Sequence, residues 1–199
     1  MEIIVAGHGG QGILELANYI SFNEFLKGRH VAYTPSYGPE SRGGKVKCYV
    51  IVADEEIDSP IVEEPDWLIV MNLPSMDFVP LLRKGGTLLF NSSLVSEEPA
   101  RTDIHAFKIS ATEAAGGLSN SEFANFVADT RIVANSVMFG AFLFLAGEAF
   151  EEELARRVFG HFFTERKAMY IPLNVAAAQR GFKLAESIIT ALPAAHYQN

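Results

Sequence analysis

The stretch that decides the fold is Glu2-Ile3-Ile4-Val5-Ala6-Gly7-His8-Gly9-Gly10-Gln11-Gly12-Ile13, at the start of a chain of 199 residues. Its first part is a short apolar run, which predicts a buried strand. Gly7, Gly9 and Gly12 follow and match the pattern G-x-G-x-x-G. From residue 13 to residue 27 apolar side chains recur at helical spacing. A strand, a glycine turn and a helix in this order predict a Rossmann-like α/β fold.

The rest of the chain continues the alternation of strands and helices. Strands are expected at His30–Thr34 (ended by Pro35), Val46–Ala53, Asp66–Met71, Thr87–Asn91 and His105–Ile109, and helices at Pro74–Arg83, Ala111–Ala115, Thr130–Ala146, Glu151–Phe159 and Ile171–Ile189. This order predicts a mostly parallel sheet with helices on both faces and a helical C-terminal third. Residues 1–190 are expected to form one domain and residues 191–199 a flexible tail.

Composition limits the classes of function. Hydrophobic residues make up 49% and charged residues 20%, as in globular proteins. The net charge of −8 argues against nucleic acid or an anionic membrane as a partner. Cys48 is the single cysteine, so the chain has too few thiolates for an iron–sulfur cluster. The start of the chain has no basic segment typical of a signal peptide, and a cytoplasmic location is expected.

Mean hydropathy is +0.15, which is high for a small soluble domain. Two explanations remain open at this stage. The chain could be an obligate subunit with an apolar interface, or its sheet could be buried on both faces. The longest apolar stretch, Val137–Ala146, is too short to span a bilayer.

The glycine loop by itself is weak evidence for a nucleotide site. A nicotinamide enzyme needs an acid about 20 residues further on, at the end of the second strand, to bind the ribose hydroxyls. Here that strand ends in Tyr33-Thr34-Pro35, and the next acid is Glu40. An NAD-dependent enzyme is therefore disfavoured. The glycines could also serve only to bring the strand and the helix close together.

A second unusual segment runs from Ser36 to Lys47. Its glycines permit backbone conformations that are closed to other residues, and its prolines restrict the remaining positions. Arg42 then presents its guanidinium from a stiff loop, a good arrangement for a phosphate or carboxylate. Lys45 and Lys47 share one face if the next strand begins as early as residue 45.

These two segments together resemble the gamma subunits of 2-oxoacid:ferredoxin oxidoreductases. Three further pieces agree: the acidic turn Asp54–Pro60, the helix start Asn135–Ala141, and Asn174 with Ala177 and Gly181 in the pattern Asn-x-x-Ala-x-x-x-Gly. The resemblance covers residues 1 to about 188. Tyr-Gly-Pro-Glu-x-Arg-Gly-Gly is similar to the 2-oxoglutarate and 2-oxoisovalerate branches, and 2-oxoglutarate is favoured.

The resemblance implies a complex that converts a 2-oxoacid and coenzyme A into an acyl-CoA and carbon dioxide and reduces ferredoxin. Thiamine diphosphate, magnesium and iron–sulfur clusters would reside in alpha, beta and ferredoxin-like delta subunits, because this chain lacks segments for them. The chain would be a binding and assembly module without catalytic or metal-binding residues. The alternative is a stand-alone module that binds coenzyme A or a nucleotide.

The residues expected to bind coenzyme A or the cofactor diphosphate come from both glycine segments. They are Gly7, Gly9, Gly10, Gln11, Gly12, Tyr37, Gly38, Glu40, Arg42, Gly43, Gly44 and Lys45.

Overall fold

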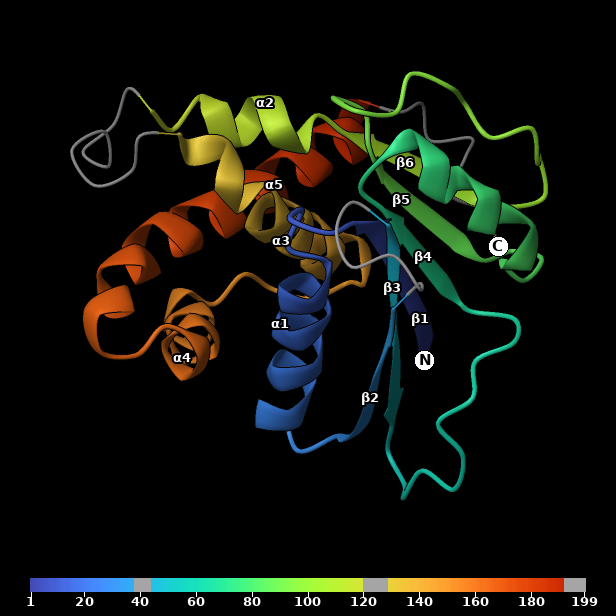
Figure 1. Cartoon of the computed structure of the whole chain (residues 1–199), viewed down its shortest axis with the longest axis horizontal. Coiled ribbons are helices and arrows are strands. Elements are labelled where there is room, and N and C mark those ends of the chain that lie inside the picture. The colour runs from blue at the N-terminus through green and yellow to red at the C-terminus, as the bar shows by residue number, and fades with distance from the viewer. Residues whose placement is uncertain (38–43, 120–128, 192–199) are drawn as a thin grey trace.

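The computed structural model describes residues 1–37, 44–119 and 129–191, and these ranges contain a six-stranded sheet (Figure 1). The strands are β1 (Glu2–His8), β2 (His30–Tyr37), β3 (Lys45–Ala53), β4 (Trp67–Val70), β5 (Thr87–Asn91) and β6 (His105–Ile109). Their order across the sheet is β2-β3-β1-β4-β5-β6. The expected α/β class, with a helical C-terminal region, is confirmed.

The sheet is mixed because β3 runs antiparallel to both of its neighbours, β1 and β2, whereas β1, β4, β5 and β6 are parallel. Only residues 38–44 connect β2 to β3. A parallel return needs a crossover of about a dozen residues or more, so this short connection can only reverse the chain. The prediction of a mostly parallel sheet holds for β1, β4, β5 and β6.

Strand β2 is longer than the sequence suggested. It continues through Pro35 to Tyr37, with Pro35 opposite Cys48 of β3, so the expected end at Thr34 is wrong. β2 lies at the edge of the sheet. Proline is tolerated there because the N–H that it lacks can belong to the unpaired side of the strand.

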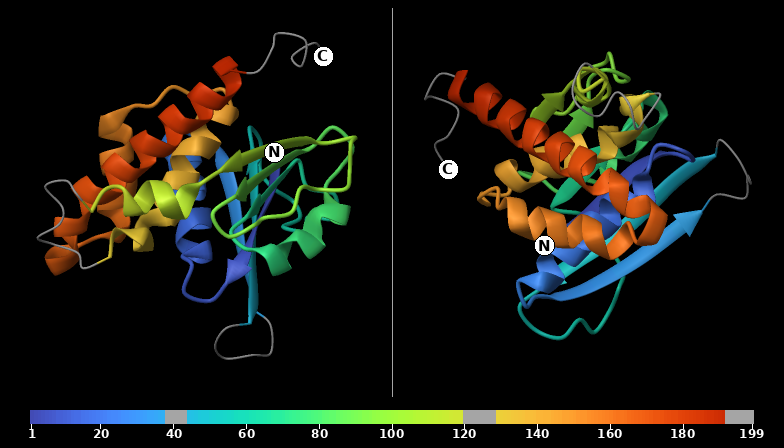
Figure 2. Two further views of the ribbon diagram at one scale, coloured as in Figure 1. Left: turned by 90° about the horizontal axis from the view of Figure 1, so that it is seen from above. Right: turned by 90° about the vertical axis from the view of Figure 1, so that its left-hand side faces the viewer.

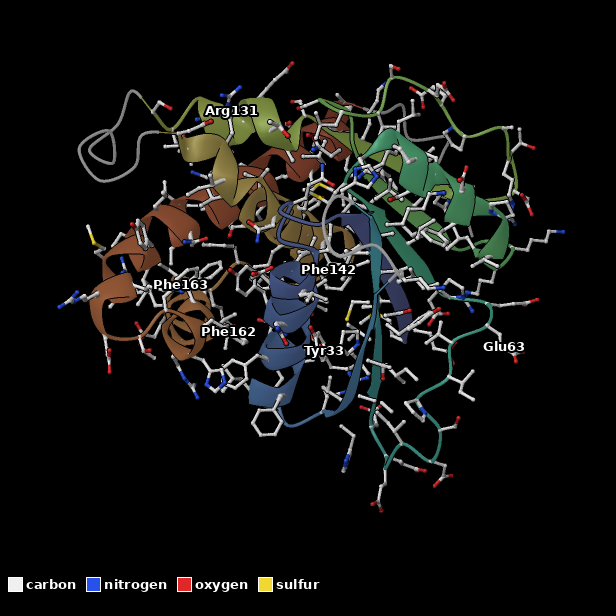
Figure 3. The ribbon with its side chains drawn as sticks, in the orientation of Figure 1. Tyr33, Glu63, Arg131, Phe142, Phe162 and Phe163 are labelled. Carbon is white, nitrogen blue, oxygen red and sulfur yellow. The ribbon has the colours of Figure 1, made fainter. Side chains whose placement is uncertain are left out.

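One face of the sheet is covered by α-helices, as the view from above shows (Figure 2). They are α1 (Ile13–Leu26), α2 (Ala111–Gly116), α3 (Ala134–Leu145), α4 (Glu152–Phe162) and α5 (Ile171–Ala191), with the 3-10 turns η3 (Thr130–Val133) and η4 (Glu165–Tyr170). Tyr19 lies at the centre of this core, within 6.0 Å of the rings of Phe139, Phe159 and Phe162. Phe162 and Phe163 lie between α4 and α1 (Figure 3).

The opposite face is covered by η1 (Leu73–Leu81) and by the connections that follow β3 and β5. A helix was expected here at residues 74–83, and the structure has a 3-10 helix that contains Pro80. Proline inside a helix removes a backbone donor and prevents a regular α-helix. Residues 3–6 of β1 are fully buried, because apolar layers cover both faces of the strand. Among the described helices, none is long and apolar enough to cross a membrane.

Helices α3 and α5 approach each other so closely that their backbones touch. A Cβ atom at Gly140 would collide with the carbonyl oxygen of Ala178, and one at Gly181 would collide with that of Val137. Next to this crossing, Ser136 Oγ donates a 2.6 Å hydrogen bond to Asn174 Oδ1. The Asn174 side chain also donates to the carbonyl oxygen of Tyr170, at 2.9 Å. The glycines and polar residues of α3 and α5 therefore hold the two helices in a single packing geometry.

Candidate functional site

The two glycine segments meet at the carboxyl end of β1. His8 of β1 is the register partner of Lys45 of β3, and the Gly9 N–H donates a long hydrogen bond, 3.4 Å, to the carbonyl oxygen of Gly44. In open α/β sheets, ligands bind beside the carboxyl ends of the parallel strands. The fold thus places the glycine loop and the described C-terminal part of the second segment, from Gly44 onward, at the edge where a ligand site is expected.

Gln11 is directed into the loop itself. Its Oε1 accepts hydrogen bonds from the His8 N–H, at 2.7 Å, and from Asn72 Nδ2, at 2.8 Å. A Cβ atom on Gly7 would lie 2.8 Å from this oxygen and would also strike Ile13. Gln11 therefore ties the glycine loop to Asn72, the residue before η1. Gly7 leaves the space for that arrangement.

Gly12 serves the packing of α1. It has φ 70° at the N-cap position, and a Cβ atom there would collide with the Asn135 amide of α3. The Asn135 Nδ2 also donates to the Gly12 carbonyl oxygen, at 3.4 Å. The alternative that the glycines serve close packing is thus supported for this residue. Gly10, with φ 93°, is exposed and has open space where a Cβ atom would be.

The electrostatic field at the start of α1 has contributions of both signs. Gly12 gives the helix no side-chain cap, and the first N–H groups of a helix favour an anion. Glu15 in the first turn is exposed and complements that positive helix end, but its carboxylate repels an anionic ligand. The topology also differs from that of a dinucleotide site, because β3 separates β1 from β2.

Lys45 and Lys47 share one face of β3, since the strand begins at Lys45. Lys45 is exposed, and its Nζ lies 2.5 Å from Asp77 Oδ2 of η1. The Lys47 ammonium lies 5.1 Å from the ring centroid of Tyr49 and 5.3 Å from that of Phe78, within cation–π range. The sequence gives no signal for the contacts with Asp77 and Phe78, because they depend on where η1 packs.

The structure describes only some of the remaining predicted site residues. Tyr37 ends β2, but its side chain is not described. Gly38, Glu40, Arg42 and Gly43 lie outside the described residues.

Cys48 is fully buried in β3, and burial raises the pKa of its thiol to about 11. The thiol therefore stays protonated at neutral pH and is a small apolar core side chain. Within the part of the chain that the structure describes, no group of three or more His, Cys, Asp or Glu residues is arranged to hold a metal ion.

Asn72 is expected to stabilise the chain through two separable contacts. Its Oδ1 accepts hydrogen bonds from the backbone and hydroxyl of Ser75, at 3.1 and 2.7 Å, and its Nδ2 donates to Gln11. Asn72→Ala removes both contacts and should lower the free energy of unfolding by about 2 kcal/mol. Asn72→Asp keeps the acceptor for Ser75 but sets a carboxylate oxygen against Gln11 Oε1, so it should also be less stable than wild type. Urea denaturation measures both, and an Asn72→Asp variant as stable as wild type would show that the Gln11 contact contributes nothing.

The chain has a Rossmann-like α/β fold in which the glycine loop adjoins the antiparallel β2–β3 pair. The comparison with protein families assigns the chain to a family. The chain belongs to the family described as pyruvate ferredoxin/flavodoxin oxidoreductase, which matches residues 2–184. The resemblance to gamma subunits of 2-oxoacid oxidoreductases is thereby confirmed.

Two curated relatives are similar to this chain over most of its length. The chain is 32% identical to the 2-oxoglutarate synthase subunit KorC of Methanocaldococcus jannaschii, over 94% of this chain and 95% of the relative. It is 31% identical to the ketoisovalerate oxidoreductase subunit VorA of Methanothermobacter thermautotrophicus, over 95% of this chain but 37% of the relative. The chain thus spans little more than a third of the length of VorA.

Solved structures agree on the fold. The gamma subunit of a keto/oxoacid ferredoxin oxidoreductase from Geobacter sulfurreducens has a TM-score of 0.74 and 28% identity, with 94% of this chain and 98% of that chain covered. The 2-oxoglutarate:ferredoxin oxidoreductase of Magnetococcus marinus has a TM-score of 0.76 at 20% identity, covering 94% of this chain and 31% of the other. The region therefore occurs both as a separate subunit and as part of a longer chain.

Proposed function

We propose that this chain is the gamma-type subunit of a 2-oxoacid:ferredoxin oxidoreductase complex, with 2-oxoglutarate as the favoured substrate. The complex oxidatively decarboxylates the 2-oxoacid, transfers the acyl group to coenzyme A and passes the electrons to ferredoxin. The observation that carries this proposal is the match to KorC, which is near full length on both chains. We place the complex in the cytoplasm, in keeping with the free, buried thiol of Cys48.

In this proposal the redox chemistry lies in the partner subunits. Alpha, beta and ferredoxin-like delta chains would hold thiamine diphosphate, magnesium and iron–sulfur clusters, which would supply the decarboxylation and electron-transfer chemistry. One cysteine, buried as a thiol, supports the assignment of the clusters to partners. Residues 1–190 then act as one binding and assembly unit.

The proposed binding surface for coenzyme A combines the two glycine segments. The exposed backbone of Gly9 and Gly10 would face the ligand, with Lys45 beside it at the start of β3. We assign to the same surface Tyr37, Gly38, Glu40, Arg42 and Gly43 of the second segment. Gly44 is buried and would support this segment from within. Three residues of the loop would support its shape without touching the ligand, because they contact other parts of the chain: Gly7, Gln11 and Gly12.

Reconstitution of the complex tests the assembly. The chain is co-expressed with alpha, beta and delta chains of such a complex, and it should co-elute with thiamine- and cluster-bearing subunits. Elution of the chain alone, with binding of coenzyme A by the isolated chain, would favour the stand-alone module instead.

A kinetic experiment on the reconstituted enzyme tests the anion site. Arg42→Ala should raise KM for coenzyme A by roughly 10-fold, the effect of about one lost charge-assisted hydrogen bond. KM for the 2-oxoacid should remain as in wild type. Arg156→Ala is the matched control, because Arg156 is exposed on α4 and pairs with Glu152. An unchanged KM for coenzyme A in Arg42→Ala would refute the phosphate role.

A further inference from the structure

Glu24 is a buried acid at the end of α1 that is remote from the glycine loop. It is 3% exposed and lies in the last turn of the helix, which has no basic residue. The carboxyl end of a helix carries partial negative charge, so an anionic side chain there is destabilised. Burial adds a desolvation penalty for the charged form. Both effects require compensation by neighbouring groups.

The compensation comes from two donors that Glu24 shares with a second acid, Glu148. Lys27 Nζ lies 3.0 Å from Glu24 Oε1 and 2.5 Å from Glu148 Oε2. Asn23 Nδ2 donates to the same two oxygens, at 3.0 and 3.2 Å. The two carboxyl groups thus flank one ammonium and one amide, although Glu148 lies beyond α3, 124 positions further along the chain.

Charge balance in this cluster favours an additional proton. Two carboxylates and one ammonium leave a net negative charge, and the side chains of Glu24 and Glu148 are only 4% and 19% exposed, while that of Lys27 is 32% exposed. Burial, together with the hydrogen bond to Glu24, raises the pKa of Glu148. Burial by itself would raise the pKa of Glu24 as well, but hydrogen bonds from Glu148 and Lys27 hold it below its usual value. Glu148 is therefore the member that carries the proton.

Other charged groups nearby are engaged elsewhere. Arg29, just beyond the end of α1, has its Nε 2.8 Å from Asp54 Oδ1. On α4, Arg156 pairs with Glu152, and the ring of His161 stacks on Phe22 with 4.0 Å between centroids. In the described part of the chain, Lys27 is the cation that pairs with both Glu24 and Glu148.

We propose that Glu24 and Glu148 share one proton in the folded chain, and that this proton fastens the turn after α3 to the end of α1. The turn is built for one geometry. Gly147 adopts φ 79°, and the Glu148 N–H donates to the Leu143 carbonyl oxygen at 3.0 Å. Loss of the proton places two carboxylates side by side and loosens the turn. The device acts within this chain and does not depend on the proposed enzyme activity.

The directions of the two pKa shifts determine how the stability of the fold changes with pH. The contribution of Glu148, whose pKa is raised, is fully present below its ordinary pKa and is lost as pH rises through the raised value. The contribution of Glu24, whose pKa is lowered, is present above its ordinary pKa and is lost as pH falls through the lowered value. The pair therefore stabilises the fold most strongly between these limits.

The test follows thermal unfolding of the full chain across a pH series that begins at the ordinary pKa of glutamate and ends at pH 9, in wild type, Glu148→Gln and Glu152→Gln. The wild-type midpoint should fall by about 2–4 °C more than that of Glu148→Gln, because a neutral amide keeps the contacts without a titrating proton. Glu152→Gln removes an exposed acid of α4 and should retain the wild-type pH dependence. Equal pH dependence in wild type and Glu148→Gln would overturn the proposal.

A second measurement applies even if Glu148→Gln does not fold. In the wild-type chain with ¹³C-labelled glutamate, one carboxyl resonance should titrate well above the ordinary range for glutamate. If all glutamates of the folded chain titrate in the ordinary range, about 4–5, no shared proton exists and the proposal fails.

Discussion

Gly181→Ala is expected to lower the free energy of unfolding by about 3 kcal/mol, the upper end of the usual range for overpacked cores. The added methyl group would collide with the carbonyl oxygen of Val137 on α3. Backbone cannot rotate away as a side chain can, so α3 and α5 must separate. Gly140→Ala should have a similar effect, because its methyl group meets the carbonyl oxygen of Ala178. Denaturant unfolding followed by circular dichroism measures both.

Gly160→Ala provides the matched control. Gly160 lies within α4, and the nearest atom to a Cβ there is Ile171 Cδ1 at 4.0 Å. Alanine is favoured over glycine in a helix by about 0.5–1 kcal/mol, so this variant should be slightly more stable than wild type. A Gly181→Ala variant as stable as wild type would mean that the close crossing of α3 and α5 is not required.

The helix crossing bears on the candidate site because α3 carries Asn135. This residue is one of the first in α3, and its amide group touches Gly12 at the start of α1. A shift of α3 would therefore move the support on which the glycine loop rests. The close packing of α3 against α5 therefore helps to hold the glycine loop in position.

Local sequence pattern predicted those parts of the fold that depend on neighbours along the chain. The strand, glycine turn and helix at residues 2–26 were predicted in the correct order because each is specified locally. The reversed direction of β3 was not predicted, since strand pairing joins distant segments. The same reason explains Pro35, which breaks a central strand but is tolerated in β2 at the edge.

The candidate site was predicted less completely than the fold. Proximity of the two glycine segments follows from the pairing of β1 with β3, which no local pattern reveals. The sequence predicts Gln11 as a ligand contact, and in the structure its side-chain oxygen accepts hydrogen bonds from His8 and Asn72. A glutamine in a glycine loop suits either role. The sequence does not show that Asn72, which follows β4, lies beside the loop and supplies one of these hydrogen bonds.

Gly12→Ala is expected to lower the free energy of unfolding by about 2–4 kcal/mol, through two separable effects. A non-glycine residue at φ 70° is itself unfavourable by about 1–2 kcal/mol. The remainder is the collision of the new methyl group with the Asn135 amide. Asn135→Ala removes the group that is struck, so in that background Gly12→Ala should cost only the first part.

Gly10→Ala completes this comparison. Gly10 also has a positive φ, 93°, but a Cβ atom there meets no atom within 4 Å. Its substitution should cost about 1–2 kcal/mol with or without Asn135→Ala. If Gly12 and Asn135 show no coupling in the double-mutant cycle, the packing explanation for Gly12 is wrong. If the coupling is confined to Gly12, the third glycine of the motif serves the contact between α1 and α3, and Gly10 takes no part in that contact.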